Sequence, residues 1–152
     1  MARRVFFSFH YQRDIWRVNQ IRNIPQVTSC AAAGFQDASL WEAAKSNSDE
    51  QIKRMINDAL NNTSVTVICI GAKTAGRKYI NYEIRQSLDR GNGLVGIQIH
   101  HLKDKDGNVD SSGETPYMIE NAGYQVYKYV DVEKLAYRIE EAAQIAIAKK
   151  KA

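Results

Sequence analysis

An apolar segment, a glycine-bounded basic loop, and a segment with aromatics and a carboxylate follow one another in the middle of the chain. The apolar segment is Val65–Ile70, the loop runs from Gly71 to Gly76, and Tyr79 and Glu83 follow it. Ligand sites in open parallel sheets lie outside the carboxyl ends of the strands, where such loops are found. Tyr79 and Glu83 are four residues apart and therefore share one face of a predicted helix. Glu83 is the leading candidate for a catalytic residue.

The neighbours of Glu83 indicate what its carboxylate can do. Most glutamates on helices are exposed to solvent and have no catalytic role. Here Tyr79 and Tyr82 flank Glu83, while apolar residues predict the opposite, core-facing side of the same helix: Ile80, Ile84 and Leu88. Partial removal from water beside aromatic rings would suit the carboxylate to stabilise a developing cation.

Ser8, Phe9 and His10 end the first predicted strand and form a second candidate group. Nucleophilic catalysis by Ser8 and His10 would need an orienting acid, and none is evident beside two residues that are only two positions apart. The sequence favours Phe9 and His10 as walls for a flat ring. Farther along the chain, Trp41 lies close to Asp37, and this tryptophan fits either the core or a ligand-facing position.

Three further patterns resemble known ligand sites, but each lacks a residue or a spacing that the site requires. The loop 71–76 has the glycine spacing of a P-loop, but Arg77 and Lys78 stand where Lys and then Ser or Thr are needed, so the magnesium ligand is missing. The loop still suits a diphosphate held by helix amides. The adjacent histidines at 100 and 101 lack Cys or Glu partners for a metal. The acidic turn 104–110 has its glycine at the wrong place for calcium.

The remaining patterns predict strands that alternate with helices. Strands are expected over 4–9, 65–70, 94–99 and 124–130, and helices over 14–23, 48–61, 78–90 and a long final segment capped by Asp131. Asp14 is the expected N-cap of the first helix, and Ser48 with Gln51 forms a capping box. A further strand between 23 and 34 has no clear place, and a short helix or turn is expected over 38–45. The alternation predicts an α/β fold: one domain over residues 1–152, with a doubly wound parallel sheet of about five strands.

The composition is that of a soluble globular protein, with 44% hydrophobic and 25% charged residues among 152. Part of the net charge of +4 comes from Lys149–Lys151, which complement the negative end of a final helix. Basic residues near the loop ends, such as Arg77, fit a small phosphorylated ligand at least as well as a polyanion, so we expect no nucleic-acid partner. Two cysteines and no apolar run of transmembrane length predict a cytoplasmic protein without membrane contact.

Four blocks of the sequence carry a resemblance to a known family. They are Arg4–His10, Phe35–Glu42, Asn61–Val67 and Arg77–Ile84. Taken together and in this order, over about residues 3 to 110, they resemble the TIR-like domain of the Thoeris antiphage protein ThsB. The resemblance implies a flavodoxin-like TIR fold that consumes NAD and releases nicotinamide. It also implies a cyclic or otherwise modified ADP-ribose product that activates a separate effector protein.

The same resemblance implies roles for individual residues. The family's catalytic glutamate lies in a Trp-x-x-x-Glu pattern, which falls here on Tyr79 and Glu83, so a tyrosine replaces the tryptophan and the indole donor is lost. Glu83 is then catalytic, and the candidate substrate-binding residues are Ser8, Phe9, His10, Asp37, Trp41, Tyr79 and Tyr82. NAD is a substrate, so we expect no cofactor and no metal. The expected partners are NAD, an effector reached through the product, and further copies of the chain through self-assembly.

Three other functions fit the same fold class. A non-catalytic TIR-type interaction module is the alternative function, and a carboxylate between two tyrosines argues against it. A phosphoacceptor receiver domain needs acids after the first strand and an aspartate ending the third, where this chain has Ser8–His10 and Ile70 with Gly71. FMN carriage is disfavoured because the loop after Phe9 lacks a phosphate cradle rich in Ser, Thr and Gly.

Overall fold

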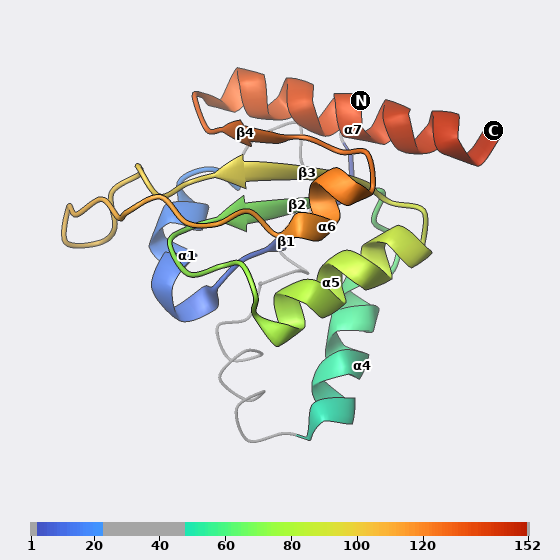
Figure 1. Cartoon of the computed structure of the whole chain (residues 1–152), viewed down its shortest axis with the longest axis horizontal. Helices are drawn as coiled ribbons and strands as arrows, with labels where there is room; N and C mark the ends of the chain where they lie inside the picture. Colours follow the sequence, from blue (N-terminus) through green and yellow to red (C-terminus); the bar gives the residue numbers. More distant parts are fainter. Residues whose placement is uncertain (1–2, 23–47, 152) are drawn as a thin grey trace.

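The computed structural model describes residues 3–22 and 48–151. Within these ranges, four parallel strands form one sheet in the order β1-β2-β3-β4. The strands are β1 (Val5–Ser8), β2 (Val65–Ile70), β3 (Gly93–Gln98) and β4 (Val126–Lys128), and the helices are α1 (Tyr11–Asn19), α4 (Asp49–Leu60), α5 (Lys78–Asp89), α6 (Tyr117–Asn121) and α7 (Val132–Lys151). This arrangement confirms the doubly wound α/β fold (Figure 1). The strand expected between 23 and 34 and the turn expected over 38–45 lie outside the described residues, and a single domain over 1–152 stays a prediction.

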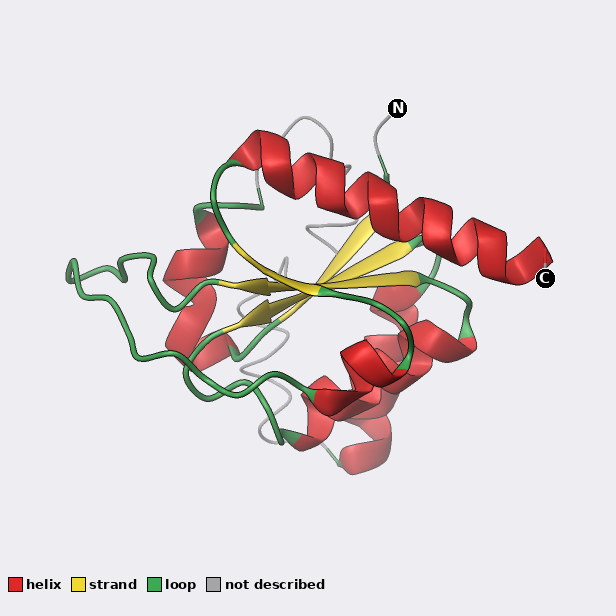
Figure 2. Ribbon diagram, turned by 45° about the horizontal axis from the view of Figure 1, so that its top comes forward, coloured by secondary structure: helices red, strands yellow, loops and turns green. Residues whose placement is uncertain are grey.

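Helices cover both faces of the sheet, because successive side chains of a strand point to opposite faces. On one face, strand residues such as Val67 and Ile97 pack with the apolar sides of α1 and α7. On the other face, Ile68 packs with α5 and α6, and Phe6 packs with α4. Figure 2 shows the sheet lying between α7 on one side and the helices α5 and α6 on the other.

The beginnings of α4 and α7 follow the sequence signals. At α4, the side chain of Ser48 accepts a hydrogen bond from the backbone N–H of Gln51, and the Gln51 side chain accepts one from the backbone of Ser48, at 3.2 and 2.9 Å. At α7, the carboxylate of Asp131 accepts a hydrogen bond of 2.8 Å from the backbone of Lys134. Each of these side chains satisfies an amide that the first helical turn leaves without a partner.

The expected start of the first helix at Asp14 is wrong. The helix α1 begins three residues earlier, at Tyr11, and the backbone N–H of Asp14 already donates a helical hydrogen bond of 2.8 Å to His10. The side chain of Asp14 is fully buried and lies 3.2 Å from the guanidinium of Arg17. Asp14 therefore neutralises a buried arginine one turn further along and does not cap the helix.

The carboxyl ends of the four strands lie at one edge of the sheet, because the strands are parallel. The loops that follow β1, β2 and β3 meet at this edge (Figure 1). None of the described helices, α7 included, is both long and apolar enough to cross a membrane. The carboxyl edge carries most of the residues that the sequence singles out.

Candidate active site

Glu83 lies in the second turn of α5 and points toward the end of β1. Ile80 and Ile84 bury the apolar stripe of α5 against the sheet, as expected, and this packing turns Glu83 toward the neighbouring strand. The hydroxyl of Ser8, the last residue of β1, donates a hydrogen bond of 2.5 Å to Oε1 of Glu83. The other oxygen, Oε2, is buried and has no hydrogen-bond partner among the described residues. The structure thus brings together two candidate residues from separate elements.

The environment of Glu83 changes its acidity. The side chain is 2% exposed, and burial raises its pKa to about 8, while the hydrogen bond from Ser8 acts in the opposite direction. A buried carboxyl with one unsatisfied oxygen is costly, because water no longer solvates its charge. Such a group is poised to ionise when a cation lies beside it.

Tyr79 and Tyr82 point from α5 toward α4. Their rings pack against the apolar side of α4. The hydroxyl of Tyr79 donates a hydrogen bond of 2.8 Å to Asp49, the first residue of α4. The hydroxyl of Tyr82 accepts one of 2.6 Å from Asn57. Both tyrosines therefore connect α5 with α4, and their role as walls for a substrate stays a prediction.

Phe9 and His10 continue the chain beyond Ser8 at the carboxyl edge. Phe9 packs in the core on the α1 and α7 face, with its ring centroid 6.0 Å from that of Tyr11, so it lies across the sheet from Glu83. His10 precedes α1, and its Nδ1 has no partner among the described residues. Burial lowers the pKa of His10, and the positive charges of Arg77 and Arg13 lower it further. A role for either residue in binding stays a prediction.

The other candidate residues and patterns add no second site. Asp37 and Trp41 lie outside the described residues, so their roles stay predictions. Within residues 3–22 and 48–151, no three His, Cys, Asp or Glu side chains gather to hold a metal ion. In the loop after β2, the backbone N–H of Gly71 donates a hydrogen bond of 2.8 Å to the hydroxyl of Thr74, so this amide is used within the loop.

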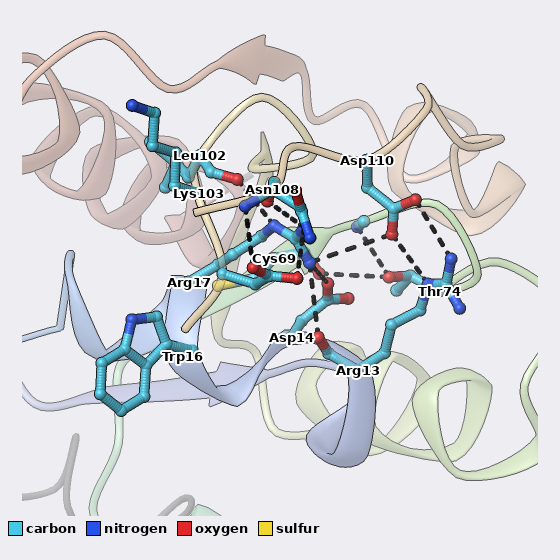
Figure 3. A network of polar contacts seen from close by, with 12 residues as sticks. Arg13, Asp14, Trp16, Arg17, Cys69, Thr74, Leu102, Lys103, Asn108 and Asp110 are labelled. Atoms are coloured by element: carbon cyan, nitrogen blue, oxygen red, sulfur yellow. Dashed lines mark hydrogen bonds and ion pairs between the residues drawn. The ribbon is translucent and has the colours of Figure 1, made fainter. Parts of the chain in front are cut away.

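A network of ion pairs and hydrogen bonds around the buried Asp14 and Arg17 joins α1 to the loop after β3, and sequence reasoning missed it (Figure 3). Arg17 is 3% exposed, pairs with Asp14, and donates hydrogen bonds of 2.8 and 3.1 Å to the carbonyls of Leu102 and Asn108. Arg13 pairs with Asp110 through two hydrogen bonds of 2.8 and 3.1 Å. The sequence offered one signal, an arginine three residues after an aspartate. This spacing predicts the ion pair but does not predict which distant backbone carbonyls the arginine contacts.

The same network encloses the loop that leads into α5. A Cβ added at Gly71 would collide with the carboxylate of Asp14, and a Cβ added at Gly113 would collide with the backbone of Gly71. The loop after β2 therefore lies between α1 and the loop after β3 with no room for a side chain at either glycine. This close packing constrains the path of the chain at the beginning of the loop that leads into α5.

The sequence of this chain is similar to known proteins. Residues 6–104 match the family model of the Thoeris protein ThsB, TIR-like domain. The chain is also 51% identical over 128 residues to a protein of Bacillus cereus (strain MSX-D12) that is named "Putative cyclic ADP-D-ribose synthase ThsB1". That match covers 82% of this chain and 65% of the length of the relative. Because the family model matches more than half of the residues, the chain belongs to the ThsB TIR-like domain family.

Proposed function

We propose that the protein is an NAD-consuming enzyme that cleaves the bond between nicotinamide and ribose, with Glu83 as the catalytic carboxylate. The observation that carries the proposal is the buried Glu83 carboxyl, with Oε1 bonded to Ser8 and Oε2 without a partner among the described residues. The name of the Bacillus cereus relative, "Putative cyclic ADP-D-ribose synthase ThsB1", supports an NAD-derived product. The product would be a cyclic or otherwise modified ADP-ribose.

One carboxylate is enough for the first chemical step. Nicotinamide leaves NAD as a neutral molecule, so the step needs no general acid, in contrast to ordinary glycoside cleavage with its two carboxylates. The ribose then carries a developing positive charge at the carbon that loses nicotinamide. An ionised Glu83 with an available oxygen would stabilise this charge in a site from which water is excluded.

The second step decides the product. If a nucleophile on the adenosine half attacks the cationic carbon, a ring closes and one proton is released. If water attacks, ADP-ribose and one proton result. Glu83 is suited to accept this proton near neutral pH, because burial raises its pKa to about 8.

The proposed activity also implies a role for the protein in the cell. The product would act as a signal in antiphage defence, made in the cytoplasm and read by a separate effector protein, and self-assembly of the chain would accompany activity. NAD is then a substrate and the effector is a partner reached only through the product. A signal producer differs from an interaction module, which would need to touch the effector.

Transfer of a small-molecule extract from challenged cells to the effector protein tests the proposal. Cells that express the protein are challenged with phage, and the low-molecular-weight extract is added to the cognate effector in the absence of this protein. Extract from wild-type cells should activate the effector, and extract from Glu83→Gln cells should not. Glu120→Gln, the same change at an exposed position on α6, serves as the matched control and should behave as the wild type. Activation that requires direct mixing of the two proteins would favour the interaction module.

A further inference from the structure

The helix α5 is tied to the sheet at two points on the same side. At the first point, the hydroxyl of Ser8 bonds to the carboxylate of Glu83. At the second point, the hydroxyl of Ser87 lies 2.7 Å from that of Thr66 in β2. All four side chains are at most 2% exposed, so water does not compete for these bonds.

The two points have matching spacings on the helix and on the sheet. Glu83 and Ser87 are four residues apart on α5, which corresponds to a rise of about 6 Å. Thr66 pairs with Phe6 across the two strands, so Ser8 lies two residues farther toward the carboxyl edge, or about 6.6 Å. Helix and strands run in opposite directions, and the two hydroxyl contacts therefore form together in one register of α5.

The hydrogen bonds of the second point have a fixed direction. The hydroxyl of Ser87 donates to the backbone carbonyl of Glu83 at 2.7 Å. A serine hydroxyl has one proton to donate, so Thr66 must donate to Ser87. The resulting chain runs from Thr66 through Ser87 to the backbone of Glu83. It holds the main chain of Glu83 from β2, while Ser8 holds the side chain from β1.

We infer that Ser8, Thr66 and Ser87 are positioning residues that hold Glu83 with one carboxylate oxygen engaged and the other turned to the substrate. None of the three needs to touch NAD for this role. The inference rests on the proposed catalytic function of Glu83, and it adds the residues that set the geometry of that function. Without the second contact, the main chain of Glu83 loses its hydrogen-bonded link to β2, and the direction of Oε2 is held less tightly.

A kinetic experiment separates positioning from general stability. Thr66→Val removes the hydroxyl and keeps the shape, and Thr66→Ser restores the hydroxyl. The matched control is Thr63→Val: Thr63 bonds to the backbone of Leu60 and to Asn92 at the opposite edge of the sheet. We expect kcat for NAD to fall about 10- to 100-fold in Thr66→Val, with KM changed less than about threefold. Thr66→Ser should regain most of the rate, and Thr63→Val should keep it.

Two kinetic results would overturn the inference. An unchanged kcat in Thr66→Val would show that the second contact does not position Glu83. Equal losses of kcat in Thr63→Val and Thr66→Val would show that kcat falls because the protein is less stable, and not because Glu83 is displaced. Thermal unfolding of each variant is measured alongside, so that a variant that fails to fold is replaced by Ser87→Ala, which removes the same contact from the helix side.

A second experiment needs no turnover of NAD. The carboxyl resonance of Glu83 is followed by NMR in protein labelled with carbon-13 glutamate, and Glu83→Gln identifies the signal. Ser8→Ala should raise the midpoint of the titration by about 1 pH unit, because a bond to the ionised form is lost. An unchanged midpoint contradicts the role of Ser8. A shifted midpoint in a protein that never consumes NAD contradicts the proposed function and leaves the positioning contacts standing.

Discussion

The hydroxyl of Tyr79 and the carboxylate of Asp49 form a hydrogen bond of 2.8 Å that joins α5 to the first residue of α4. Lys78 pairs with the same carboxylate at 2.7 Å. These two contacts hold the pKa of Asp49 well below its usual range. The hydroxyl of Tyr79 gives the helix pair a contact that its ring alone does not provide.

The first prediction concerns the two parts of Tyr79. Tyr79→Phe should keep NAD turnover within about threefold and lower the free energy of unfolding by about 1 kcal/mol or less, because only a half-exposed hydrogen bond is lost. Tyr79→Ala should lower the free energy of unfolding by about 2 to 4 kcal/mol, because the ring no longer packs in the apolar cluster with α4. Urea unfolding and a turnover assay measure both effects. Equal loss of turnover in the two variants would assign the role to the hydroxyl.

The second prediction is a pH dependence of stability that belongs to Glu83. Burial raises its pKa from 4.5 to about 8, so between these values the folded protein holds a proton that the unfolded chain releases. The free energy of unfolding should therefore fall as pH rises from about 4.5 to 8. Relative to Glu83→Gln, the wild type should lose on the order of 4 kcal/mol across this window. Chemical unfolding at pH 5 and pH 8.5 gives the difference, and a constant difference would place the pKa near its ordinary value.

The third prediction is a pH dependence of activity. The ionised form of Glu83 is the one that stabilises a cation, so kcat/KM for NAD should rise with pH and level off above about 8. Ser8→Ala should move this rise to higher pH. The rate is measured as nicotinamide release at constant ionic strength. A flat profile from pH 6 to 9 in the wild type would exclude Glu83 as the titrating group.

The fourth prediction concerns the buried pair of Asp14 and Arg17. Arg17→Met should lower the free energy of unfolding by about 3 to 5 kcal/mol, because Asp14 keeps a buried charge without its partner. The double variant Asp14→Asn with Arg17→Met should be more stable than Arg17→Met alone. Arg13→Met, which removes an arginine that is 41% exposed, is the control and should cost about 1 kcal/mol or less. Additive losses in the double variant would contradict the pairing.

The elements of the fold follow from local patterns where those patterns are complete. The capping box at Ser48 and the apolar stripe of α5 predicted their helices within a residue or two. The helix α6 was missed, because five residues after Pro116 are too few to show a period. The N-cap at Asp14 was wrong because residue type alone does not reveal a buried arginine partner.

The sequence predicted the individual residues of the site, but it did not predict the hydrogen bonds between them. Ser8 and Glu83 each stood at a strand end or a helix start, where ligand sites of such sheets lie. Their hydrogen bond joins residues 75 positions apart, and the contact of Thr66 with Ser87 joins residues 21 apart. Such bonds depend on how the helix packs on the sheet, and no local sequence pattern predicts that packing. The burial of Glu83 depends on the same packing and was not predictable for the same reason.

Release of nicotinamide from NAD by wild type, Glu83→Gln and Glu120→Gln tests the central claim most directly. Each protein is taken from phage-challenged cells, and its folding is checked by circular dichroism and thermal unfolding. The account predicts at least about a hundredfold loss of turnover in Glu83→Gln, because the change keeps the shape of the side chain and removes its charge. It predicts wild-type turnover in Glu120→Gln. Turnover near the wild-type rate in a folded Glu83→Gln protein would contradict the catalytic assignment.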